Sequence, residues 1–329
     1  MRVLVTGGTG FVGAHTVKAV LDAGHEVKLL VRSPERISPA LEPLGVTGHM
    51  DHVVGDVTDA ASVEAAIRGC GAVIHCASVY SNDRRRAKEV TRTNLASAQT
   101  VLGLAVERGL DPVVHVSSIV ALMPAARDVI DEGSEPGRKG PPYPASKQAQ
   151  ERYARELQAT GAPVVITYPG SVWGPNDPYD GESTTLARNF KRGMVPFRPF
   201  GGIPVVDVRD VAAAHGALVE PGKGPRRYML GGHYTKVSDL VRLTCSAAGV
   251  RRPGIPIPNS MAYVSGLMTA PLQRLAPFRL PIDPGGTWAI RCNVRADNSK
   301  AERELGVRFR PTAETLADQV AWQKAAGRL

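Results

Sequence analysis

The sequence predicts an α/β protein built on a doubly wound parallel sheet (a Rossmann fold) with a smaller C-terminal lobe that binds the substrate. An apolar run at residues 2–6 leads directly into a glycine-rich stretch at residues 7–13. Further apolar runs then alternate with helical patterns along the first half of the chain, as in parallel sheets covered by helices on both faces. A tyrosine and a lysine stand four residues apart, at Tyr143 and Lys147.

Six segments are predicted as strands because each is short, apolar and rich in β-branched residues. They are residues 2–6, 26–32, 53–56, 72–77, 112–118 and 163–168. Helical patterns lie between them, notably at residues 14–22, 62–68, 88–108 and 146–159. Ligands of such sheets bind beyond the carboxyl ends of the strands. Residues that follow different strands are therefore expected to converge on one crevice.

The glycine-rich stretch predicts a phosphate site. Gly7, Gly10 and Gly13 have the spacing Gly-x-x-Gly-x-x-Gly between the first strand and the first helix. Glycines allow a tight turn and a close approach of the backbone to a pyrophosphate, and the helix N-terminus offers N–H groups and a positive dipole end. An ordinary glycine turn is the alternative interpretation.

Tyr143 and Lys147 predict acid–base chemistry. If this segment opens a helix, the two side chains lie on one face. A lysine ammonium beside a phenol favours the phenolate and lowers the pKa of the tyrosine. Tyr143 is therefore a candidate general acid or base for interconverting a carbonyl and an alcohol. For the spacing taken alone, a solvated helix face is the alternative.

Composition excludes several classes of protein. The 329 residues are 43% hydrophobic and 22% charged, as in soluble globular proteins. A strand signal from residue 2 leaves no room for a signal peptide, and no apolar run approaches the roughly 18 residues of a membrane span. The four cysteines form no Cys-x-x-Cys pair, so we expect free thiols and no metal site. A cytoplasmic location is the resulting expectation.

The formal net charge of +9 raises the question of an anionic partner. Residues 84–86 form the only tight basic run, and aromatic residues make up 5% of the chain, which leaves little for stacking on bases. Nucleic acid is therefore not expected. A cofactor that carries an additional phosphate accounts for part of the positive charge.

These segments together resemble the extended short-chain dehydrogenase/reductase family, the NAD-dependent epimerase/dehydratase superfamily. The matching segments are residues 6–13, 55–57, 75–78, 93–95, Ser117–Ser118, Tyr143, Lys147, 168–175, 206–212 and 298–306. The resemblance covers about residues 1–220 and is closest to the dihydroflavonol reductase and hydroxysteroid dehydrogenase branches. Residues 232–296 carry no motif of the family.

The resemblance implies catalytic roles for four residues. Tyr143 would give or take the proton on the substrate oxygen, and Lys147 would lower its pKa and reach the nicotinamide ribose. Ser118, rather than Ser117, would hold the substrate oxygen near Tyr143. Asn94 would bind backbone or water and help a proton relay. A strand-end hydroxyl for either serine and a structural helix residue for Asn94 are the alternatives.

The resemblance also implies a cofactor site. Its residues are Gly7, Thr9, Gly10, Phe11, Val12, Gly13, Arg32, Asp56, Val57, Ala77, Ser78, Lys147, Pro169, Ser171 and Val172. Arg32 ends the second strand where an NAD enzyme would carry an acidic residue, so we expect it to bind the 2′-phosphate of NADP, supported by Ser33 or Arg36. NAD is the less expected cofactor, and a surface arginine is the alternative interpretation. NADP favours reduction over epimerisation.

The expected nucleotide-binding domain spans residues 1–171 plus about 205–227, and the substrate-binding lobe spans 172–204 and 228–329. Large apolar residues of the second lobe are candidates for an apolar pocket, or simply for its core. These residues are Trp173, Tyr179, Phe190, Met194, Phe197, Phe200, Met261, Tyr263, Met268 and Phe278. Family members often dimerise through the two long helices at about 88–108 and 146–159, which makes a homodimer a candidate assembly.

Three functions remain open on the sequence. The first is an NADP-dependent oxidoreductase acting on an apolar ketone, aldehyde or alcohol. The second is a sugar-nucleotide epimerase or dehydratase, against which stand the apolar residues 119–123 and a tyrosine, Tyr168, at the family's arginine position. The third is a non-catalytic nucleotide sensor, a class that typically lacks the tyrosine found here at position 143.

Overall fold

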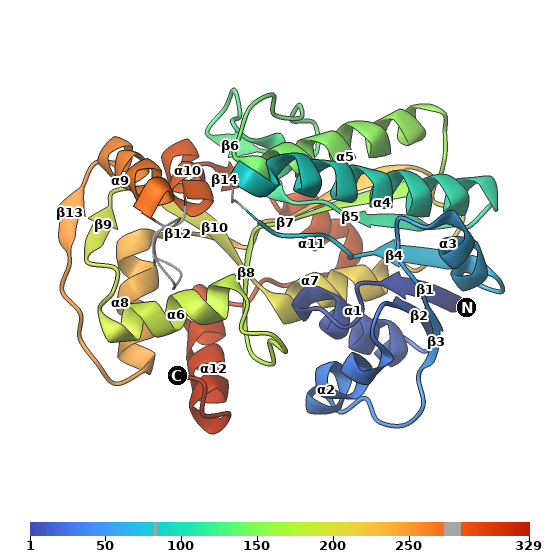
Figure 1. Cartoon of the computed structure of the whole chain (residues 1–329), viewed down its shortest axis with the longest axis horizontal. Helices are drawn as coiled ribbons and strands as arrows, with labels where there is room; N and C mark the ends of the chain where they lie inside the picture. The colour runs from blue at the N-terminus through green and yellow to red at the C-terminus, as the bar shows by residue number, and fades with distance from the viewer. Residues whose placement is uncertain (82–83, 273–283) are drawn as a thin grey trace.

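The computed structural model describes residues 1–81, 84–272 and 284–329, and it is built around a parallel sheet (Figure 1). The sheet has seven strands in the order β11-β7-β5-β4-β1-β2-β3, and every neighbouring pair is parallel. Its strands are β1 (Arg2–Thr6), β2 (Glu26–Val31), β3 (Asp51–Val54), β4 (Ala72–His75), β5 (Val113–Val116), β7 (Val164–Pro169) and β11 (Arg226–Leu230). The predicted doubly wound α/β fold is confirmed. The edge strand β11 was not predicted.

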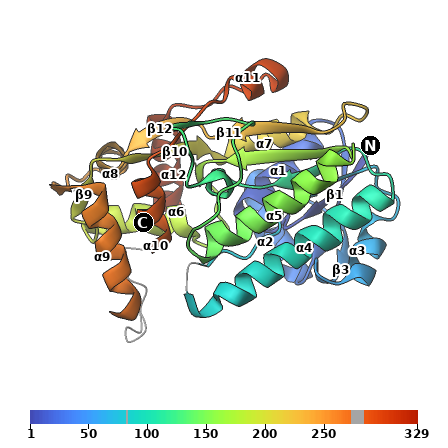
Figure 2. The same ribbon diagram turned by 90° about the horizontal axis from the view of Figure 1, so that it is seen from above.

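Helices cover both faces of this sheet, because successive strand side chains point to opposite sides. Val3 and Val5 belong to one hydrophobic core and Leu4 to the other. α1 (Phe11–Asp22), α2 (Ile37–Leu41) and α7 (Val208–Ala217) pack on the first side. α3 (Ala60–Ile67), α4 (Ala87–Glu107) and α5 (Pro142–Ala159) pack on the second, where α4 and α5 lie side by side (Figure 2).

Helix α5 begins four residues earlier than predicted, at Pro142 instead of Ser146. Proline is well tolerated in the first turn of a helix, because its missing N–H would have no helical partner there. Tyr143 therefore lies within the first turn of α5, and Lys147 lies one turn further along the same face.

A second, smaller group of elements forms the C-terminal lobe, seen at the left of Figure 1. It contains a three-stranded sheet of β8 (Ser171–Trp173), β10 (Gly202–Asp207) and β12 (His233–Lys236), and a pair of β9 (Phe197–Pro199) with β13 (Ile255–Ile257). Its helices are α6 (Glu182–Arg192), α8 (Val237–Ala247), α9 (Asn259–Leu272) and α12 (Thr312–Ala325). Trp173, Phe190, Leu240 and Leu316 lie in its core.

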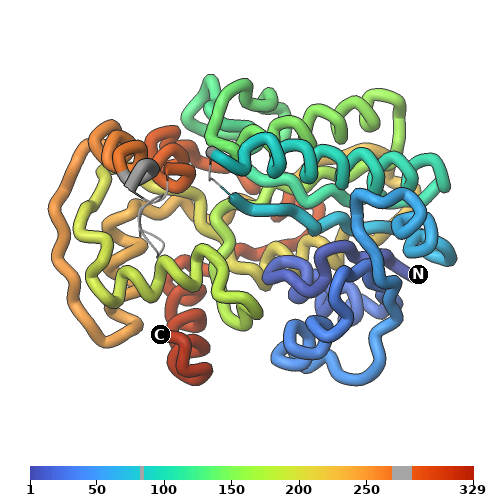
Figure 3. Tube along the Cα trace, in the orientation of Figure 1, coloured from blue at the N-terminus to red at the C-terminus, as the bar shows by residue number. Residues whose placement is uncertain are grey.

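The chain passes between the two groups more than once, as the tube in Figure 3 shows. Helix α10 (Pro284–Cys292) packs against α9 of the second lobe and inserts Trp288 into one core of the first domain. Helix α11 (Ser299–Leu305) then lies against the first domain, where Ala301 enters the other core. Between these helices, β14 (Arg295–Ala296) pairs with β6 (Val129–Ile130). The division of the chain at the residues given above stays a prediction.

The described residues also form four short 3₁₀ segments: η1 (Pro34–Arg36), η2 (Glu42–Leu44), η3 (Arg84–Arg86) and η4 (Ile119–Leu122). Within the described ranges, no helix is long and apolar enough to cross a membrane. The same part of the chain holds no group of three or more histidine, cysteine, aspartate or glutamate side chains placed to bind a metal ion. All four cysteines are free.

Candidate active site

The carboxyl ends of β1 and β4 meet at the centre of the sheet, where the strand order reverses. Such a reversal is the usual ligand site of an open α/β sheet. Here the glycine loop lies against the segment that follows β4: a Cβ atom on Gly7 would lie 2.7 Å from the Ala77 nitrogen. Gly7 also has φ +69°, a conformation that favours glycine. Ala77 therefore borders the glycine loop, and the exposed Ser78 follows it directly.

The loop itself leaves the first turn of α1 open to an anion. Gly10 is the N-cap of α1 and offers no side chain to the first-turn N–H groups of Phe11, Val12 and Gly13. Its own N–H donates to the Gly7 carbonyl at 2.9 Å, and a Cβ on Gly13 would lie 2.0 Å from the same oxygen. This cradle, which also contains Thr9, fits a pyrophosphate at a helix N-terminus.

The end of β2 presents an available cation. Arg32 is exposed and makes no hydrogen bond or ion pair with any residue that the structure describes. It lies close enough to Asp56 to help lower the pKa of that carboxyl. The larger cause of this lowered pKa is Thr58, whose N–H and hydroxyl donate to Asp56 Oδ1 at 2.8 and 2.7 Å. The next residue, Val57, packs against the second core.

Arg36 connects this region to the second lobe. Its guanidinium carbon lies 5.3 Å from the centroid of the Tyr179 ring, a cation–π contact. Ser33, the other candidate support for a 2′-phosphate, is the N-cap of η1, and its carbonyl accepts the Arg36 N–H at 3.2 Å. The structure thus places Arg36 in a contact between lobes that the sequence did not indicate.

Lys147 is almost fully buried below the end of β5. Its Nζ donates to the Val116 carbonyl at 3.0 Å. Burial lowers the pKa of Lys147 to about 8, against the opposing effects of Cys76 and Glu151. The ammonium therefore stays largely protonated at neutral pH while it lies at the strand ends.

The prediction that Lys147 lowers the pKa of Tyr143 is wrong. The sequence predicts a lowered pKa for the phenol, but burial raises the pKa of Tyr143, and the Glu182 carboxylate raises it further. The ring of Tyr80 covers Tyr143, with 4.6 Å between the ring centroids. Desolvation of the phenolate is the larger of these two effects, and both favour the protonated phenol.

The two serines after β5 point to different partners. Ser117 is buried and its hydroxyl donates to Glu151 Oε2 at 2.8 Å. Ser118 is only partly buried, and its Oγ lies 3.4 Å from the Pro169 carbonyl and caps η4. Side chains of neighbouring residues in an extended chain point to opposite sides. Because Ser117 points to Glu151 of α5, Ser118 points away from that helix, which supports the choice of Ser118 as the serine that contacts the substrate.

Asn94 holds the segment after β4 against the start of α5. Its Oδ1 accepts the Val79 N–H at 2.8 Å, and its Nδ2 donates to the Val79 carbonyl and to Ser146 Oγ, both at 2.9 Å. Ser146 in turn donates to the Tyr143 carbonyl at 2.7 Å. These bonds place the Asn94 amide in contact with backbone, one of the roles expected from the family.

The remaining predicted cofactor residues follow β7. Pro169 ends that strand, Ser171 Oγ accepts a hydrogen bond from the Trp173 indole at 2.9 Å, and Val172 packs against the first core. Of the apolar pocket candidates, Trp173 and Phe190 lie in the core of the second lobe. Tyr179, Met194, Phe200, Met261 and Met268 are exposed. Phe278 lies outside the described residues.

Sequence reasoning missed several residues around the site. His75 and His115 stack in the sheet at 5.9 Å, and His75 Nδ1 lies 2.7 Å from Thr6 Oγ1. Both ring nitrogens of His115 are buried without a partner in the described part of the chain. Glu151 was also missed, although Tyr143, Lys147 and Glu151 continue one four-residue spacing that would have indicated it.

Comparison with known proteins places the chain among nicotinamide-dependent enzymes. The model of the NAD dependent epimerase/dehydratase family matches residues 3–231. A Synechocystis sp. protein that carries the provisional name dihydroflavonol 4-reductase is 30% identical over 97% of this chain and 93% of its own length. The expected resemblance to the dihydroflavonol reductase branch is thereby confirmed.

Two solved structures extend the comparison over the whole fold. The crystal structure of gox2253 superposes with a TM-score of 0.82, at 27% identity, over 100% of this chain and 99% of its own. DesIV, a dTDP-glucose 4,6-dehydratase from Streptomyces venezuelae with NAD and TYD bound, gives a TM-score of 0.76 at 25% identity, over 99% and 97% of the two chains.

Proposed function

The chain belongs to the NAD-dependent epimerase/dehydratase family and is a nicotinamide-dependent oxidoreductase, and we propose that it reduces an apolar ketone or aldehyde with NADPH. The observation that carries this proposal is that Tyr143 and Lys147 lie one turn apart at the start of α5, with Lys147 Nζ bonded to the carbonyl of Val116, two residues before Ser118. Reduction of a carbonyl needs a proton donor at its oxygen, and a phenol with a raised pKa keeps that proton at neutral pH.

The bound nicotinamide supplies the hydride in this reaction. Tyr143 donates its hydroxyl proton to the substrate oxygen, and the Ser118 hydroxyl orients the same oxygen. One N–H of the Lys147 ammonium donates to the Val116 carbonyl, and the remaining N–H groups bind the nicotinamide ribose. Asn94 acts as a positioning residue, because its amide ties the segment after β4 to the first turn of α5.

The glycine cradle and the residues around it hold the dinucleotide. Gly7, Gly10 and Gly13 bring the backbone close to the pyrophosphate, and the uncapped first turn of α1 supplies N–H donors. Asp56 accepts from the adenosine portion. Arg32, exposed and unpaired within the described residues, binds the 2′-phosphate that distinguishes NADP from NAD.

The apolar nature of the substrate is inferred from the residues next to Ser118. The four residues of η4, Ile119–Leu122, follow it directly and are all apolar, and Ile119, Ala121 and Leu122 are buried. They leave no acidic side chain in η4 to act on a sugar. The name of the Synechocystis relative, dihydroflavonol 4-reductase, also points to an apolar ketone as the substrate.

A second candidate is a sugar-nucleotide epimerase or dehydratase, which the likeness to DesIV favours. Such an enzyme would use bound NAD and regenerate it within each turnover. Cofactor preference therefore separates the two candidates. A homodimer formed through α4 and α5 stays a prediction under either.

The first experiment is a pair of calorimetric titrations of the purified protein, one with NADPH and one with NADH. We expect NADPH to bind at least tenfold more tightly, a difference of about 1.4 kcal/mol. Oxidation of NADPH is then followed with a panel of aryl ketones, aryl aldehydes and steroid ketones. A Tyr143→Phe variant should bind NADPH normally and lose turnover, whereas preference for NADH without turnover of the panel would favour the second candidate.

A further inference from the structure

Beyond Lys147, helix α5 carries another pair of side chains at the same four-residue spacing, Glu151 and Arg155. The Glu151 side chain is fully buried and its carboxylate accepts three hydrogen bonds. Ser117 Oγ donates to Oε2 at 2.8 Å, whereas the Tyr168 hydroxyl and Arg155 Nε each donate to Oε1 at 2.6 Å. A carboxylate with this set of donors is fixed in position, because a buried charge that loses a partner is costly.

Two of these donors come from the strand ends that border the proposed reaction site. Ser117 follows β5 and directly precedes Ser118, and Tyr168 lies in β7 directly before Pro169. Because β5 and β7 are neighbours in the sheet, one carboxylate on α5 holds both strand ends. A movement of α5 along the sheet would break these bonds and would also change the separation of Tyr143 from Ser118.

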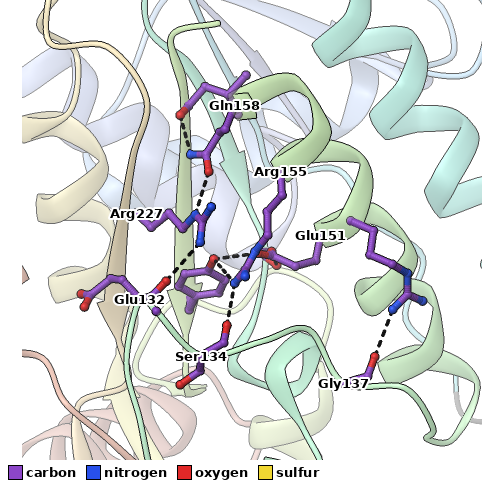
Figure 4. A network of polar contacts seen from close by, with 12 residues as sticks. Glu132, Ser134, Gly137, Glu151, Arg155, Gln158 and Arg227 are labelled. Carbon is purple, nitrogen blue, oxygen red and sulfur yellow. Dashed lines mark hydrogen bonds and ion pairs between the residues drawn. The ribbon is translucent and has the colours of Figure 1, made fainter. Parts of the chain in front are cut away.

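Arg155 extends the same contact to the loop that leads into α5 (Figure 4). Its Nη2 donates to the Ser134 carbonyl at 2.9 Å and to the Tyr168 hydroxyl at 3.2 Å. One turn earlier, Arg152 Nη1 donates to the Gly137 carbonyl at 3.1 Å. Hydrogen bonds from Arg152 and Arg155, in the middle of α5, therefore hold the loop that precedes Tyr143.

We propose that Glu151 is a positioning residue of the site, which fixes α5 against β5 and β7 so that Tyr143 and Lys147 stay in register with Ser118. The role given to those three residues rests on the function proposed above. Glu151 also acts on Lys147 through its charge, because its carboxylate raises the pKa of the Lys147 ammonium against the effect of burial. That second effect provides a measurement that needs no substrate.

The test is a titration of Lys147 by NMR in protein labelled with ¹³C at lysine Cε, with the signal assigned by its loss in Lys147→Arg. In Glu151→Gln we expect the pKa of Lys147 to fall, because a neighbouring opposite charge is removed. Glu156→Gln is the matched control: it makes the same change at an exposed position of the same helix and should leave the Lys147 titration unchanged.

Turnover supplies the second readout, with NADPH and whichever ketone of the panel is reduced. Glu151→Gln should lower kcat at least tenfold while the Kd for NADPH stays within twofold, and Glu151→Asp should recover part of the loss. Ser117→Ala and Tyr168→Phe each remove one hydroxyl donor and keep the carboxylate, so each should lower kcat several-fold even if Glu151→Gln fails to fold.

A folded Glu151→Gln protein with an unchanged Lys147 titration would overturn the proposal, and so would unchanged kcat in both Ser117→Ala and Tyr168→Phe. The titration is independent of the reductase assignment. If no ketone of the panel is reduced, the proposed function fails while the Lys147 measurement still decides the role of Glu151.

Discussion

The ring of Tyr80 lies against the ring of Tyr143, with 4.6 Å between the centroids and 56° between the planes. Tyr80 follows β4 and Tyr143 opens α5, so the contact joins two segments that are far apart in the sequence. The covering ring helps keep water from the phenol whose pKa burial raises. Tyr80 is therefore part of the environment that keeps Tyr143 protonated.

A Tyr80→Ala variant should lower the pKa of Tyr143 toward the ordinary value for tyrosine, because water would reach the phenolate. The pKa can be followed by NMR in protein labelled with ¹³C at tyrosine Cζ, with the signal assigned by its loss in Tyr143→Phe. Tyr179→Ala removes another exposed ring, one that packs against Arg36 instead of Tyr143, and is the control. A Tyr143 titration that is identical in Tyr80→Ala and the parent protein would contradict this prediction.

Replacement of Arg32 by alanine should weaken NADPH binding at least tenfold and change NADH binding less than twofold. The reason is that only NADPH carries the 2′-phosphate that the exposed guanidinium is proposed to bind. Calorimetry with both dinucleotides measures the two constants. Arg68→Ala removes an exposed arginine that lies after α3 and should change neither. Equal losses for the two cofactors would reject the assignment of Arg32.

The two serines after β5 should respond differently to removal of their hydroxyls. Ser118→Ala should lower kcat by about 100-fold, a typical contribution of a group that positions or stabilises a reacting atom. It should leave thermal stability within about 0.5 kcal/mol, because Ser118 makes only long hydrogen bonds at 3.4 Å.

Ser117→Ala should show the reverse balance, with a smaller loss of kcat and a destabilisation of about 1 to 3 kcal/mol, because it removes a donor from the buried Glu151 carboxylate. Steady-state kinetics and thermal unfolding of both variants measure these effects. A larger loss of kcat in Ser117→Ala than in Ser118→Ala would reverse our choice between them.

Buried histidines should make the fold sensitive to acid. Burial lowers the pKa of His75 and of His215 to about 3 and that of His115 well below 6.5. Between about pH 6.5 and 3 the unfolded chain therefore binds protons that the folded chain does not, and stability falls as the pH falls through this window. Each such group contributes about 1.4 kcal/mol per pH unit.

His115→Leu should raise stability at pH 7 by about 1 kcal/mol or more, because neither ring nitrogen of His115 has a partner in the described part of the chain. The gain should be larger at pH 5. His75→Leu should lose stability at pH 7, because it removes the contact with Thr6 Oγ1 at 2.7 Å. Denaturant unfolding at the two pH values checks both, with exposed His49→Leu as the control. Destabilisation by His115→Leu at pH 5 would show that its nitrogens are bound in solution.

Local patterns in the sequence determined the nucleotide-binding half of the fold. Continuous apolar runs such as residues 2–6 predict strands buried on both faces, and the glycines that follow predict a tight turn into a helix. The edge strand β11 was not predicted because it begins with two arginines, Arg226 and Arg227, and so lacks a continuous apolar run. Arg227 is accommodated by Gln158 of α5, a partner that only the folded chain brings near.

The spacing of Tyr143 and Lys147 likewise indicated the chemistry from sequence, because four residues make one helical turn. The sequence did not determine which of Ser117 and Ser118 faces the substrate, since that depends on which side of β5 is covered by α5. Nor did it determine the direction of the Tyr143 pKa shift. That shift depends on burial under Tyr80 and on Glu182 in the second lobe, contacts made only when distant segments pack together.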